Sequence, residues 1–125
     1  MRQDCHPGCG VRSALIVTTL ILHGAACAQT YPAKPVRLIS PYTAGGTNDA
    51  VARMVAGHMS KAMGQQWVVE NRPGRGGNIG AELVARAAPD GYTLVHGGMG
   101  SLTIAPFLSK LPYDPQRDFA PVGVT

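Results

Sequence analysis

Charge is scarce in this sequence of 125 residues. Only 14% of the residues are charged. The 11 lysine and arginine residues outnumber the 7 aspartate and glutamate residues, but they form no basic run. Aromatic residues make up only 6%. Nucleic-acid-binding proteins gather basic side chains on one face, and single-strand binders need several stacking aromatics. We therefore expect no nucleic-acid partner.

Cysteine is confined to the first 27 residues, at Cys5, Cys9 and Cys27. The chain beyond Cys27 therefore cannot build a disulfide framework. Cys5 and Cys9, with His6 between them, supply at most part of the four-ligand set of a structural zinc site. We expect no metal site and no cofactor.

A long hydrophobic run is also missing. The apolar stretch at residues 13–22 has about ten residues, roughly half the length of a membrane span. Arg2 and Arg12 precede it and Ala26-Cys27-Ala28 follows it. This is the order of a secretory signal peptide with an A-x-A cleavage site. We predict a signal peptide at residues 1–28, with acylation at Cys27 and a buried N-terminal helix as alternatives.

From residue 29 onward, strand and helix patterns alternate within a length that allows one domain. Apolar and β-branched runs predict strands at residues 36–40, 67–71 and 93–96, and the start of a fourth at 122–124. Helical spacing predicts helices at residues 47–63 and 78–88, and a short one at 102–108 that is broken at Pro106. This order predicts an α/β fold with a parallel sheet, right-handed crossovers and helices on both faces.

The same periodicity predicts which side chains are buried. For the helix at 47–63 the predicted inward face consists of Val51, Met54, Val55, His58, Met59 and Ala62. For the helix at 78–88 it consists of Ile79, Leu83, Val84 and Ala87. Trp67 is expected in the core.

Three glycine-rich loops follow the three predicted strands, at residues 41–47, 72–78 and 97–101. The carboxyl ends of parallel strands meet at one edge of a sheet, where ligands bind in α/β folds. Glycine lets backbone amides approach a ligand, and the first two loops lead into helix starts that favour an anion. Hydroxyl donors at Thr43, Thr47 and Ser101 strengthen a carboxylate or phosphate site. The alternative is that these glycines make only tight turns.

Other polar residues near the loops have simpler interpretations. Asp49 would cap the helix start, or alternatively orient a water or a ligand hydroxyl. Arg72 and Arg75 fit a solvated surface, and His96 has no evident catalytic partner. No nucleophile elbow, Walker loop or paired carboxylates occur, so we expect no enzyme. The alternative is a small anion- or phosphate-binding α/β enzyme domain.

Four segments in order resemble one protein family. They are YPAKPVRLISPYTAGGTND (31–49), VENRPGRGGNIG (69–80), APDGYTL (88–94) and LPYDP with DFAP (111–121). They are similar to the Bug-type (TctC-like) extracytoplasmic solute receptors, the substrate-binding components of tripartite tricarboxylate transporters. The resemblance implies a type II periplasmic-binding-protein fold, in which two α/β domains close on a small carboxylate. It also implies a periplasmic location and membrane transporter subunits as partners.

The resemblance also implies a binding site. Its first-domain grip would consist of Tyr42, Thr43, Ala44, Gly45, Gly46 and Thr47, with Asp49 close behind. Gly76, Gly77, Asn78 and Ser101 would complete the substrate-binding wall.

Family members are considerably longer, so the resemblance implies that residues 29–125 are an incomplete N-terminal domain of a solute receptor. A cleft protein buries its ligand between two walls. We therefore expect little carboxylate affinity from this chain alone. We also expect marginal stability, because sheet edges and apolar faces would lack covering neighbours.

Overall fold

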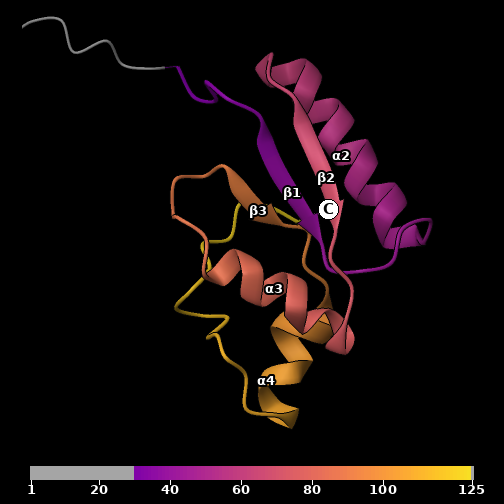
Figure 1. The fold of residues 1–125 in the computed structure, drawn as a ribbon, viewed down its shortest axis with the longest axis vertical. Helices are drawn as coiled ribbons and strands as arrows, with labels where there is room; N and C mark the ends of the chain where they lie inside the picture. Colours follow the sequence, from indigo (N-terminus) through magenta and orange to yellow (C-terminus); the bar gives the residue numbers. More distant parts are fainter. Residues whose placement is uncertain (1–29, 125) are drawn as a thin grey trace, which may run out of the picture. The chain divides into compact units, whose positions relative to one another are not determined.

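The computed structural model describes residues 30–124, so the predicted signal peptide and the acylation alternative at Cys27 lie outside the described residues. From Tyr31 onward the chain forms one compact unit. Its sheet contains three parallel strands in the order β2-β1-β3, with β1 at Val36–Ser40, β2 at Trp67–Asn71 and β3 at Thr93–Val95 (Figure 1). The parallel α/β fold expected from the sequence is confirmed.

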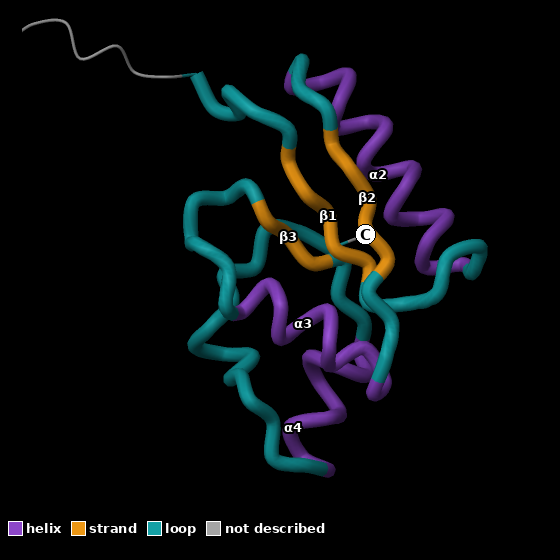
Figure 2. Tube along the Cα trace, viewed as in Figure 1, coloured by secondary structure: helices purple, strands orange, loops and turns teal. Residues whose placement is uncertain are grey.

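The helices connect and follow these strands (Figure 2). They are α2 (Thr47–Met63), α3 (Asn78–Ala85) and α4 (Ala105–Leu108), with a 3₁₀ turn at Arg75–Gly77 and a π-helical turn at Gly100–Ile104. The predicted bounds of α2, β1 and β2 are confirmed. Helical periodicity or a β-branched run defines each of these elements, and a glycine or proline close to its end limits it.

Several predicted elements differ in the structure. The predicted strand at 93–96 ends one residue earlier, at Val95. The predicted helix at 78–88 ends at Ala85, because Ala87 already bonds three residues back to Val84 and Pro89 disfavours helix before it. The predicted glycine-rich loop at 97–101 instead enters the π-helical turn at Gly100. That turn continues into α4, whose first turn accommodates Pro106, so the predicted break was wrong.

The predicted fourth strand is also wrong for the residues that are described. Val122 and Val124 are 80% and 102% exposed and pair with no strand. Without burial against a sheet face, a β-branched pair does not make a strand.

The central strand β1 is covered along its length on one face and at its carboxyl end on the other. Val36 and Leu38 pack in the core under α2, together with Ala52, Ala56 and Trp67, which confirms Trp67 as a core residue. Ile39 is fully buried and, by strand alternation, faces the opposite side. There α3 contacts β1 and β3, so the expected helices on both faces are confirmed.

The buried face of α2 differs from the predicted one. Met54 is 67% exposed and His58 and Ala62 are exposed, whereas Val51, Val55 and Met59 are only partly buried. Ala52 and Ala56, four residues apart, face the sheet instead. Small side chains let the helix backbone come close to the strands, which rotates the contact stripe away from the larger residues.

Helix α3 likewise packs through its smallest residues. Gly80 and Ala81 are buried, whereas Ile79, predicted to point inward, is 45% exposed. A Cβ added to Gly80 would lie 2.8 Å from Pro41 Cβ and 3.1 Å from the carbonyl oxygen of Arg72. This close approach fixes α3 against the residues that follow β1 and β2.

Candidate functional site

The loops that follow β1, β2 and β3 lie together at the carboxyl edge of the sheet, as the topology predicted. Gly77 marks the meeting point. Its φ is +96°, and a Cβ added there would lie 3.4 Å from both Pro41 Cβ and Ser101 Oγ. Residues from all three loops therefore meet around one glycine, whose positive φ other residues rarely adopt.

The start of α2 is open at this edge. Gly46 is the N-cap residue and has no side chain to bond the first amides of the helix, and the first intrahelical bond runs from Ala50 N–H to the Gly46 carbonyl over 3.0 Å. Residues 43–48 are exposed. The unpaired amides of the first turn and the helix dipole together favour a negatively charged group.

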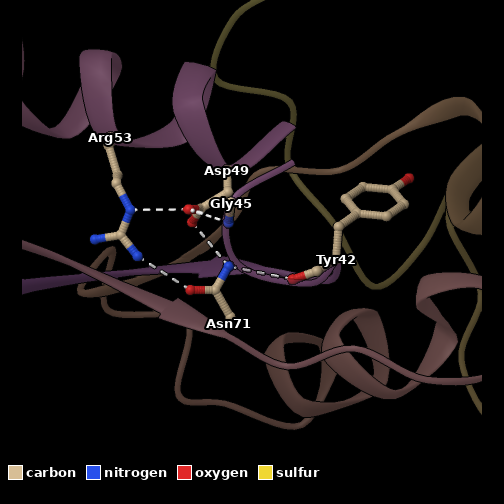
Figure 3. Close-up of polar contacts among 5 residues, drawn as sticks. All are labelled: Tyr42, Gly45, Asp49, Arg53 and Asn71. Atoms are coloured by element: carbon tan, nitrogen blue, oxygen red, sulfur yellow. Dashed lines mark hydrogen bonds and ion pairs between the residues drawn. The ribbon is translucent and has the colours of Figure 1, made fainter. Parts of the chain in front are cut away.

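Asp49 lies just behind these amides and is only 4% exposed (Figure 3). Its Oδ2 accepts hydrogen bonds from Gly45 N–H at 2.9 Å and from Arg53 Nε at 3.0 Å. Its Oδ1 accepts one from Asn71 Nδ2 at 2.8 Å. The Arg53 bond, followed by those from Gly45 and Asn71, holds the pKa of the Asp49 carboxyl well below its ordinary value. Asp49 lies in the first turn of α2, where its charge complements the helix dipole. Its backbone bond, however, goes to Gly45 before the N-cap and not to an amide of the helix, so the predicted bond to free helix amides is not formed.

Tyr42 connects the first loop to the third. Its carbonyl oxygen accepts a hydrogen bond of 3.2 Å from Asn71 Nδ2, while its ring points away from Asp49 (Figure 3). A Cβ added to Gly98 would overlap the Tyr42 hydroxyl. Glycine at position 98 therefore makes room for the half-buried Tyr42 ring.

Tyr113 ties the second loop to the third, from a segment that follows α4. Its buried hydroxyl lies 3.0 Å from Asn78 Oδ1 and 2.8 Å from the Ser101 carbonyl oxygen. Burial raises the pKa of this phenol, so it stays protonated and can donate.

The remaining predicted site residues differ in accessibility. Ala44, Gly45, Gly46, Thr43, Thr47 and Gly76 are exposed, Tyr42 and Asn78 are partly buried, and Asp49, Gly77 and Ser101 are buried. Ser101 Oγ is fully buried and has no hydrogen-bond partner among the described residues. Ser101 therefore lies beneath the edge rather than on it.

Reasoning from the sequence missed Arg53, Asn71 and Tyr113. Arg53 stands four residues after Asp49, the spacing of a helical ion pair, so a signal was available. Asn71 ends its strand at the same edge as the loops. Tyr113 gave no signal beyond its place in the LPYDP motif, because its partners are remote in the sequence.

A large hollow lies elsewhere in the described part of the chain. It has a volume of about 1330 Å³ and is lined mainly by apolar residues of α2, α3, β3 and residues 115–124. His96, Gly97 and Gly98 border it, but residues of the first and second loops do not. Within residues 30–124, no helix is both long and apolar enough to cross a membrane, and no cluster of three metal-ligating side chains occurs.

Comparison with known proteins identifies relatives. Residues 51–124 match the family described as tripartite tricarboxylate transporter family receptor. A UPF0065 protein of Bordetella bronchiseptica is 48% identical over 100 residues, covering 79% of this chain and 30% of the relative. The protein BugT of Bordetella pertussis is 37% identical over 113 residues, covering 88% of this chain and 34% of the relative.

Two solved structures extend the likeness to the fold. A structure described as a periplasmic transporter superposes with a TM-score of 0.65 at 47% identity, over 68% of this chain and 29% of that one. MatC from Rhodopseudomonas palustris with bound malate superposes with a TM-score of 0.62 at 40% identity, over 74% of this chain and 32% of that one. The chain spans about a third of the length of these proteins. It belongs to the tripartite tricarboxylate transporter receptor family, the Bug/TctC-type solute-binding proteins.

Proposed function

We propose that this chain forms part of an extracytoplasmic receptor that binds a small carboxylate and delivers it to the membrane subunits of a tripartite tricarboxylate-type transporter. The observation that carries the proposal is the open start of α2 at an edge where three loops meet. A carboxylate suits this edge because unpaired amides and the helix dipole stabilise a negative charge. MatC, which shares this fold, holds malate in its own structure.

The ligand would meet residues 43–47 first, because these are exposed at the helix start. Thr43 and Thr47 add hydroxyl donors, and the Tyr42 ring forms a wall toward the third loop. Gly76, Gly77 and Asn78 would line the neighbouring side. We assign Ser101 and Asp49 supporting roles, because both are buried.

We propose that the protein binds rather than catalyses. Its role calls for no cofactor, because backbone amides and hydroxyls alone suffice to hold an anion. Residues 1–28 would direct the chain to the periplasm, and residues 29–125 would form one part of a first lobe. A second lobe would supply the opposite wall, since receptors of this kind enclose their ligands between two surfaces.

The test is an NMR titration of the isotope-labelled chain with malate, which detects millimolar as well as tighter binding. We expect amide shifts at residues 43–49 and 76–78, and none with the uncharged diamide of malate. Gly46→Val should weaken the response about tenfold or more, because a branched side chain shields the first amides of α2. Gly46 has φ −83° and ψ 171°, an extended conformation that valine also adopts.

The control variant is Gly57→Ala, at an exposed position in the same helix that contacts nothing nearby. It should respond to malate as the unmodified chain does. Shifts that spread over the whole sheet, or that appear equally with the diamide, would contradict the proposed site. A response to inorganic phosphate that exceeds the malate response would favour a phosphate-binding domain instead.

A further inference from the structure

Asp49, Arg53 and Asn71 form a closed triangle in which each side chain bonds the other two (Figure 3). Arg53 Nε donates to Asp49 Oδ2 over 3.0 Å, and Arg53 Nη2 donates to Asn71 Oδ1 over 3.2 Å. Asn71 Nδ2 closes the triangle by donating to Asp49 Oδ1 over 2.8 Å. The three residues come from the first and second turns of α2 and from the end of β2.

The triangle holds the first loop at two points. Asp49 Oδ2 accepts the amide of Gly45 at 2.9 Å, and Asn71 Nδ2 donates to the Tyr42 carbonyl oxygen at 3.2 Å. Gly45 has φ +84°, so the loop turns there through a conformation that favours glycine. One tie fixes the beginning of the loop and the other fixes this turn.

Both ties bond the loop, and the proposed site needs no ligand contact from the triangle itself. Both Asp49 oxygens are occupied by the chain's own donors, and the Gly45 amide is directed to Asp49. The anion would therefore rely on the amides that follow Gly45. Arg53 also balances the charge of Asp49, so that a bound anion would not meet an uncompensated carboxylate directly behind the helix start.

We propose that the triangle of Asp49, Arg53 and Asn71 is a positioning device that sets the shape of the β1–α2 loop before a ligand arrives. This inference rests on the carboxylate-binding function proposed above. Ordering a loop at the moment of binding costs conformational entropy, and a loop that is already ordered avoids that cost. The triangle thus raises the affinity for the ligand although it does not itself contact the ligand.

The first experiment measures amide hydrogen exchange of the unmodified chain, with NMR as the readout. Gly45 is exposed, yet its amide should exchange at least about tenfold more slowly than an unbonded amide, because it donates to a carboxylate. Asp49→Ala should abolish most of this protection, because it removes the carboxylate oxygen that accepts the Gly45 amide. Free exchange of Gly45 in the unmodified chain would overturn the proposal, even if every variant failed to fold.

The second experiment separates position from charge by malate titration. Arg53→Gln leaves an unbalanced carboxylate, whereas the double variant Asp49→Ala with Arg53→Gln is neutral again but lacks the acceptor for the Gly45 amide. We expect the double variant to remain at least about tenfold weaker than the unmodified chain. Recovery of full affinity would mean that only charge mattered and would overturn the positioning role.

Arg86→Gln is the matched control, because Arg86 pairs with Glu82 on α3 at the same four-residue spacing. It should change neither the Gly45 exchange nor the malate response. If the unmodified chain shows no malate response while Gly45 stays protected, the proposed function fails and the loop-setting role of the triangle stands. Equal loss in Arg86→Gln would identify a general loss of stability and refute the specific role.

Discussion

Replacing Gly80 by alanine should destabilise the protein, although alanine is the better helix former. Gly80 lies in the first turn of α3, where an added Cβ would stand 2.8 Å from Pro41 Cβ, 3.0 Å from Pro41 Cα and 3.1 Å from Arg72 O. Two of these three are backbone atoms, so no side-chain rotation relieves the clash. Either α3 must move off the sheet or the residues after β1 must shift.

The size of the effect follows from two opposing contributions. Alanine gains at most about 1 kcal/mol over glycine in helix propensity. Overpacking of a close contact costs about 1–3 kcal/mol. Gly57 in α2 isolates the first contribution, because nothing lies within 4 Å of its added Cβ. Gly57→Ala should therefore stabilise the fold, and the free energies of unfolding of the two variants should differ by about 1–3 kcal/mol.

The assay is chemical denaturation of the two variants and the unmodified chain, followed through Trp67 fluorescence or circular dichroism. In a thermal scan the same difference corresponds to about 4–8 °C per kcal/mol for a domain of this size. If the Gly80→Ala and Gly57→Ala variants have equal free energies of unfolding, the close approach of α3 to Pro41 is refuted. That result would also mean that the packing of Gly80 against Pro41 and Arg72 does not hold the first and second loops together.

Two further predictions concern contacts near the site and on the sheet. Tyr113→Phe should lower the free energy of unfolding by about 1–2 kcal/mol, because the carbonyl of Ser101 and Oδ1 of Asn78 share the single hydrogen of this phenol and would both lose it. Urea denaturation would measure the change, and an unchanged midpoint would contradict this shared hydrogen bond. The hydrogen bond from Arg37, with a further one from Arg72, lowers the pKa of Glu70 from 4.5 to about 2, so the stability that Glu70 adds is present above pH 4.5 and is lost as pH falls toward 2. Glu70→Gln should therefore reduce the pH dependence of stability between pH 5 and 2, and an unchanged slope in a pH series of denaturation curves would refute the pairing.

Sequence patterns predicted most of the fold because its long elements carry strong local signals. The spacing of residues 47–63, closed by Gly64 at φ +67°, determined both ends of α2. The runs at β1 and β2 were equally clear. Short elements failed, because a few residues near Pro106 or Val122 carry too little periodicity to decide between turn, helix and strand.

The buried faces were predicted less well, since periodicity reports where large apolar residues recur and not how closely two backbones approach. Met54 and Ile79 fit the helical spacing but lie exposed, because Ala52, Ala56 and Gly80 form the contacts instead. Only packing in three dimensions shows that the smallest residues bring these helices closest to the sheet.

For the proposed site, the sequence by itself predicted the location. Glycine-rich loops after parallel strands must gather at one edge, and a helix that begins there must offer its free amides. The tertiary structure alone decided which residues hold those loops, because Asn71 and Tyr113 reach partners 22 to 35 positions away in the chain. Hydrogen bonds over such separations leave no local trace in the sequence, since they depend on how the strands and helices pack.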